Sequence, residues 1–152
     1  MSKVTLLYAS IHHNNTKKVV DYIKNNLNDE INVLDITKTK YCDLSNSEYI
    51  IFASGIYHGS MHQSIVKYIN DTDLIDKKII LFYTCGLRYK DYVASLGKKL
   101  IKKNAKYIGS CYCRGHDTNG FIKKMGGIGK SHPNEKDCFK VLIKIKKLMK
   151  KY

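Results

Sequence analysis

Five apolar segments rich in Val, Ile, Leu, Tyr and Phe constrain the fold of this chain more than any other feature. Their apolar residues are mostly continuous rather than alternating, which is typical of strands covered on both faces. Between them, apolar residues recur at helical spacing, as in Val19, Val20, Ile23 and Leu27. The expected strands span residues 3–9, 31–36, 49–54, 78–84 and 107–113.

Strands that alternate with helices in this way predict a three-layer α/β/α sandwich built on a parallel sheet of five strands. Right-handed crossovers then place helices on both faces of the sheet. A chain of 152 residues corresponds to one domain, so we expect residues 1–152 to form a single unit with a sizeable core.

The net charge indicates possible binding partners less clearly than the apolar pattern indicates the fold. The chain carries 27 Lys and Arg against 13 Asp and Glu, a formal net charge of +14. Such a charge attracts acidic proteins, nucleic acid or anionic membrane surfaces, but a solvated lysine-rich surface or a compositional bias also explains it. Because the lysines are scattered and no nucleic-acid reading element is recognisable, we expect no specific nucleic-acid partner.

The cysteines bear on the cellular compartment. They form an odd set of five with no secretory leader ahead of them, which predicts free thiols and a cytoplasmic location. Cys111 and Cys113 lack the partner spacing of a tetrahedral site, so we expect no metal. No segment is apolar enough to span a membrane.

The first expected strand ends in a polar loop, residues 10–16, and a helical pattern follows it directly. This arrangement aims the N–H groups and positive dipole end of a helix beyond the strand, where a phosphate is the natural occupant. Ser10, Asn14 and Thr16 add uncharged donors. An ordinary strand-to-helix turn capped by Asn or Thr remains an alternative interpretation of this loop.

Two further loops, residues 54–59 and 84–90, follow the third and fourth expected strands. In open parallel sheets, ligands bind beyond the carboxyl ends of the strands, so the three loops are expected to converge there. Gly55 and Gly86 let the backbone approach a flat ligand, and Tyr57 provides a ring that can stack on it. Together these features suit flavin mononucleotide (FMN).

Three stretches of the sequence resemble the flavodoxin family. The run Leu7-Tyr-Ala-Ser10 and its Asn-Asn-Thr16 turn resemble the flavodoxin phosphate loop, and residues 54–59 resemble the second flavin loop. The run from Cys113 to Asn134 resembles a motif of a subgroup of single-domain flavodoxin-like proteins. The resemblance spans essentially the whole chain.

This resemblance implies a flavodoxin-like sheet in the order 2-1-3-4-5, with FMN bound non-covalently and electrons shuttled between redox partner proteins. It implies that residues 10–16 bind the phosphate and that residues 54–59 and 84–90 flank the ring. We assign no catalytic residue. The candidate cofactor-binding residues are Ser10, His12, His13, Asn14, Asn15, Thr16, Ser54, Gly55, Ile56, Tyr57, Gly59, Thr84, Cys85, Gly86 and Tyr89.

The chain departs from the family pattern in three ways. Its phosphate loop is one residue longer, and Asn14 stands where a turn glycine is common, although asparagine tolerates the left-handed conformation. Typical flavodoxins are acidic whereas this chain is basic, so we expect acidic redox partners.

Two other functions remain open. One is an FMN-dependent oxidoreductase acting on NAD(P)H, a quinone or protoporphyrinogen, with residues 114–132 forming a substrate pocket. The other is a cofactor-free basic module for nucleic acid. We expect an electron carrier rather than a stand-alone enzyme.

Overall fold

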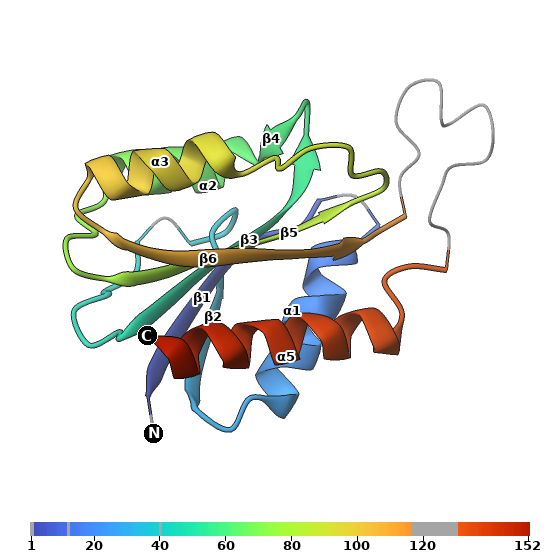
Figure 1. Cartoon of the computed structure of the whole chain (residues 1–152), viewed down its shortest axis with the longest axis horizontal. Helices are drawn as coiled ribbons and strands as arrows, with labels where there is room; N and C mark the ends of the chain where they lie inside the picture. The colour runs from blue at the N-terminus through green and yellow to red at the C-terminus, as the bar shows by residue number, and fades with distance from the viewer. Residues whose placement is uncertain (1, 12, 40, 117–130) are drawn as a thin grey trace.

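Five parallel strands lie side by side in the order β2-β1-β3-β5-β6 (Figure 1). The computed structural model describes residues 2–11, 13–39, 41–116 and 131–152. Taken along the chain, this is the predicted order 2-1-3-4-5, so the flavodoxin-like sheet is confirmed. The strands are β1 (Lys3–Ala9), β2 (Glu30–Asp35), β3 (Tyr49–Tyr57), β5 (Lys78–Cys85) and β6 (Lys106–Arg114).

A short sixth strand was not predicted. β4 (Ser60–Met61) pairs antiparallel with the end of β3, so β3 continues to Tyr57 instead of ending at residue 54. His58 and Gly59 make the two-residue turn between them, with φ values of 52° and 81°. Two consecutive left-handed residues match the twist of paired strands, which explains why a glycine stands at this position.

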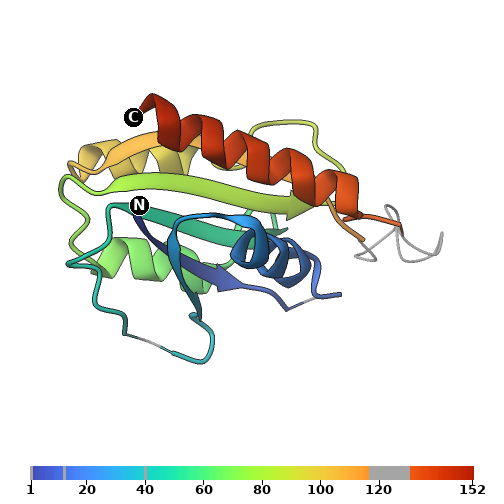
Figure 2. The same ribbon diagram turned by 90° about the horizontal axis from the view of Figure 1, so that it is seen from below.

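Four helices cover the two faces of the sheet in the described ranges (Figures 1 and 2). α1 (Asn15–Asn26) and α5 (Glu135–Lys151) lie on one face, and α2 (Gln63–Asp71) and α3 (Ala94–Lys102) lie on the other. Neighbouring residues of β3 serve the two cores, because Ile51 packs on the α1/α5 side and Phe52 on the α2/α3 side. Within these ranges, none of the helices is long and apolar enough to cross a membrane.

Side chains define the start of α5. Pro133 lies one residue before the N-cap, Asn134. The Asn134 side chain accepts from the Asp137 N–H, and the Asp137 carboxylate accepts from the Asn134 N–H at 2.9 Å each, which is a capping box. The same carboxylate pairs with His132 Nδ1 at 2.5 Å. Side-chain capping, rather than proline, thus defines this helix start.

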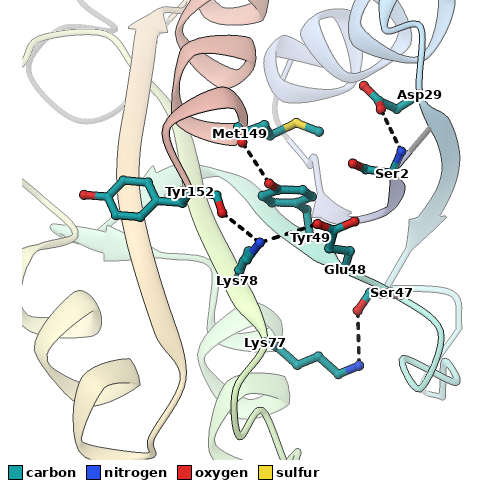
Figure 3. Close-up of polar contacts among 9 residues, drawn as sticks. All are labelled: Ser2, Asp29, Ser47, Glu48, Tyr49, Lys77, Lys78, Met149 and Tyr152. Atoms are coloured by element: carbon teal, nitrogen blue, oxygen red, sulfur yellow. Dashed lines mark hydrogen bonds and ion pairs between the residues drawn. The ribbon is translucent and has the colours of Figure 1, made fainter.

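Polar contacts hold the far end of α5 at the amino ends of the strands (Figure 3). The Tyr49 hydroxyl donates to the Met149 carbonyl at 2.8 Å. Lys78 Nζ donates to the Tyr152 main-chain oxygen at 2.8 Å and lies 3.4 Å from a Glu48 carboxylate oxygen. These contacts fix one end of the sandwich, and the polar loops gather at the opposite end.

Candidate functional site

The loop between β1 and α1 takes a tight left-handed path. His13 and Asn14 have φ values of 56° and 53°, so asparagine accommodates the conformation that glycine would otherwise supply. Asn14 is the N-cap of α1, yet its side chain makes no capping hydrogen bond. Ser10 Oγ instead accepts from the Lys17 N–H at 3.1 Å. The loop therefore brings the α1 N-terminus to the carboxyl end of β1.

A buried hydroxyl pair joins this helix start to the end of β5. Thr16 Oγ1 and Thr84 Oγ1 lie 3.0 Å apart, and the two residues are 1% and 3% exposed. Because they lie 68 positions apart in the chain, only folding brings them together. The first and third predicted loops thus share a hydrogen bond beneath the site.

The end of β6 also binds this loop, which the sequence reasoning did not predict. Asn15 Nδ2 donates to the His116 carbonyl at 2.8 Å, and the His116 N–H donates to Asn15 Oδ1 at 3.2 Å. The Gly115 N–H donates to the Cys85 carbonyl at 3.0 Å. A Cβ on Gly115 would lie only 2.6 Å from Asn15 Nδ2, so a glycine there allows this close approach.

Two histidine rings meet over the phosphate loop. The ring centroids of His13 and His116 are 4.3 Å apart. Nε2 of His116 is buried and has no hydrogen-bond partner among the described residues. A buried ring nitrogen normally finds a partner, so this atom is available to a ligand group. The resemblance included residue 116, but its contact with the loop could not be read from sequence spacing.

Tyr57 lies between the first and second loops. Its ring covers Gly55, where a Cβ would lie 3.1 Å from the tyrosine hydroxyl. That hydroxyl accepts from the Ile11 N–H at 3.4 Å, and the ring packs edge-on against His62 at 5.2 Å between centroids. Ser54 Oγ accepts from the His62 N–H at 3.0 Å. The second loop is therefore tied both to the phosphate loop and to the start of α2.

Burial and its hydrogen bond to α2 favour the neutral form of His62. Burial lowers the pKa of its ring. Its Nδ1 accepts from the Ser64 N–H at 3.1 Å and so caps α2, a role that a protonated Nδ1 cannot fill. The His62 ring therefore gives Tyr57 an uncharged neighbour.

The third loop is only partly brought to the site. Cys85 and Gly86 are buried at the end of β5, whereas Tyr89 is 74% exposed and packs edge-on against Tyr92 at 5.5 Å. Arg88 Nε donates to the Tyr83 hydroxyl at 2.8 Å and tethers this loop to β5.

The remaining predicted positions are less closely involved. Ile56 is half-buried and pairs with Met61, and Gly59 lies in the hairpin turn. His12 and residues 117–130 of the expected 114–132 loop lie outside the described residues. Whether the fifteen candidate residues bind a cofactor stays a prediction.

The two lysines in the first turn of α1 form their contacts with residues outside the phosphate loop. Lys17 Nζ pairs with Asp21 at 2.8 Å, and Lys18 Nζ donates to the Pro133 carbonyl at 2.6 Å. The groups that the loop itself presents are amides, hydroxyls and imidazoles. This donor set suits a phosphate held by hydrogen bonds and by the helix dipole.

The comparisons with known proteins agree with this architecture. A family model described as a flavodoxin domain matches residues 5–119. The chain belongs to the flavodoxin family. This flavodoxin is 36% identical to an uncharacterized protein of Methanocaldococcus jannaschii over 150 residues, covering 97% of this chain and 99% of the relative.

Solved flavodoxins share its fold. Oxidised flavodoxin 2 from Bacillus cereus superposes with a TM-score of 0.72 at 16% identity, covering 99% of this chain and 100% of that one. A mutant Fusobacterium nucleatum flavodoxin, solved with flavin mononucleotide bound, gives a TM-score of 0.69 at 18% identity and covers 100% and 98% of the two chains. At these identities the likeness shows the fold alone.

Four of the five cysteines of this flavodoxin are buried: Cys85, Cys111, Cys113 and Cys138. Burial raises the pKa of Cys111 to about 12 and also raises that of Cys113. No disulfide links the five cysteines, all of which lie in the described part of the chain. In that part, no group of three or more His, Cys, Asp or Glu side chains gathers to hold a metal ion.

Proposed function

We propose that this flavodoxin binds FMN non-covalently and carries electrons between redox partner proteins in the cytoplasm. The observation that carries the proposal is that hydrogen bonds join the β1–α1 loop to the end of β3 and to the end of β5 at one sheet edge. Membership of the flavodoxin family supports it. The resemblance of the phosphate loop points to FMN among the flavins.

The residues present fit this cofactor. Ser10, Asn14 and the N-terminus of α1 offer uncharged donors for a phosphate, and the buried His116 Nε2 still lacks a partner among the described residues. Tyr57 offers an aromatic ring, and Gly55 allows close approach of the backbone. When bound, FMN supplies the one- and two-electron redox chemistry that the side chains themselves lack. The protein binds, orients and shields it.

An Asn14→Asp substitution tests where the phosphate sits. Aspartate also tolerates the left-handed conformation, and its charge interacts favourably with the positive end of a helix, so α1 should keep its stability. Its charge repels the phosphate at close range, however, and FMN affinity should fall about tenfold or more. Riboflavin, which has no phosphate, should lose far less affinity. Flavin fluorescence quenching measures both.

Asn25→Asp is the matched control, because it makes the same charge change at an exposed position near the other end of α1. It should leave FMN affinity unchanged. A protein that stays colourless in excess FMN, or an Asn14→Asp variant that binds FMN normally, contradicts the proposed site. Bleaching of the bound flavin by NAD(P)H alone would overturn the carrier role in favour of an oxidoreductase.

A further inference from the structure

A groove of about 560 Å³ lies between α2, α3 and β4, away from the phosphate loop. Its lining includes the apolar side chains of Met61, Val66 and Leu96. Met61 and Leu96 are almost fully buried, at 2% and 8% exposed, and form the floor of the groove, whereas Val66 is partly exposed. We call this surface the α2–α3 groove. Its apolar lining can receive a side chain from another molecule.

Three lysines of α3 line the same groove: Lys98, Lys99 and Lys102. All three are exposed, and none forms an ion pair with a described residue. Their spacing places them within about one helical turn of each other. The groove therefore combines an apolar lining with a cluster of unpaired positive charge.

No ion pair in the described residues joins Asp71, Asp73, Asp76 or Asp91, the acidic residues of the neighbouring segments, to this cluster. Asp71 of α2 pairs with Lys67 at 2.8 Å. Asp91, which precedes α3, accepts from the Val93 N–H at 3.1 Å. No acidic residue occurs within α3 itself. The three lysines thus remain available to carboxylates from outside the chain.

The groove adjoins the two segments expected to flank the flavin ring. Ser60, which lines it, directly follows the His58-Gly59 turn of the β3–β4 hairpin. Tyr92, which also lines it, packs edge-on against Tyr83 of β5 at 5.9 Å. A molecule in the groove therefore lies beside the second and third loops.

We propose that the α2–α3 groove docks an acidic segment of a partner protein, with an apolar side chain against the partly exposed Val66 and carboxylates on the lysines. Complementary charge steers association, and exposed charge pairs bind weakly and reversibly, which suits a transient complex. Nucleic acid would bind through its phosphates, which require only the lysines. The apolar lining of the groove therefore favours a polypeptide, which has apolar side chains to place there. That the partner exchanges electrons rests on the proposed function.

A labelled peptide tests the docking. The probe is a short fluorescein-labelled peptide of Glu-Leu-Glu-Glu repeats, and its affinity is measured by fluorescence anisotropy with the FMN-free protein. Replacing Lys98, Lys99 and Lys102 together by Gln should weaken binding by about tenfold. Replacing the leucines of the peptide by serine should also weaken binding to the unaltered protein, because the groove lining then loses its apolar contacts.

The matched control replaces three exposed lysines of α5 by Gln: Lys140, Lys144 and Lys147. It changes the net charge equally, and it should alter affinity less than about twofold. Equal losses in the two triple variants, or equal affinity for the leucine and serine peptides, would show general charge attraction and overturn the proposal. Tighter binding of a single-stranded DNA probe at the same three lysines would also overturn it.

FMN titration of both triple variants separates this proposal from the previous one. Both should bind FMN like the unaltered protein, since none of these lysines belongs to the candidate cofactor site. Peptide binding without FMN uptake would contradict the proposed function alone. FMN uptake without selective peptide binding would contradict the docking site alone.

Discussion

The hydroxyl pair of Thr16 and Thr84 offers the sharpest test of how the site is held together. Replacing Thr16 by Val exchanges a hydroxyl for a methyl group of similar size, so little cavity forms. The Thr84 hydroxyl, however, is left in a site that is only 3% exposed without its partner. A buried unsatisfied polar group costs about 1–3 kcal/mol, and Thr84→Val should cost a similar amount for the same reason.

The double variant should behave differently. With both hydroxyls gone, neither polar group is stranded, and two methyl groups meet in a buried site. Replacing both partners of a hydrogen bond by apolar groups of similar shape is nearly neutral, so we expect a loss within ~1 kcal/mol. The two substitutions are therefore coupled by at least ~1 kcal/mol, as expected for residues in direct contact.

Urea unfolding followed by far-UV circular dichroism measures these changes, which suits a chain without tryptophan. With a slope of about 2 kcal/mol/M, each single variant should shift the midpoint by about 0.5–1.5 M. The double variant should unfold near the midpoint of the unaltered protein. Additive losses at constant slope would refute the reasoning, because they would show that the two hydroxyls do not depend on each other.

Three further substitutions test other parts of the fold. Gly115→Ala forces Asn15 away from its two hydrogen bonds, so calorimetry should show a melting temperature about 3–6 °C lower; an unchanged value would contradict the close approach. Burial raises the pKa of Asp137, but the hydrogen bond from His132 contributes to an overall lowering. The resulting stability is present above about pH 4 and lost as the pH falls further, and Asp137→Asn should flatten this loss in melting curves recorded against pH. Gly109→Ala should cost about 1–3 kcal/mol in urea unfolding, because φ is 145° there and a Cβ would lie 2.8 Å from an α5 side chain; a neutral result would contradict that packing.

Much of the fold was predictable because it is encoded locally. Continuous apolar runs identified the five parallel strands, and helical spacing predicted that helices lie between them. The conformation of Asn14 was also predictable, since it depends on one residue and its tolerance of positive φ. The β3–β4 hairpin was not predicted, although Gly59 is typical of a turn. The apolar run of residues 49–54 already had the length of a complete buried strand, so the strand was expected to end there.

Sequence patterns were enough to predict the layers and the polar loops at the strand ends, and the resemblance to flavodoxins predicted the sheet order. The pairs of side chains that meet, Thr16 with Thr84 and Asn15 with His116, became known only from the folded chain. The folded chain also shows that Tyr89 faces solvent and that three α3 lysines line a groove. The difference lies in the separation of the interacting residues along the chain. Periodicity and turn chemistry act between near neighbours, whereas these contacts join residues far apart in the chain, whose approach depends on how the whole sandwich packs.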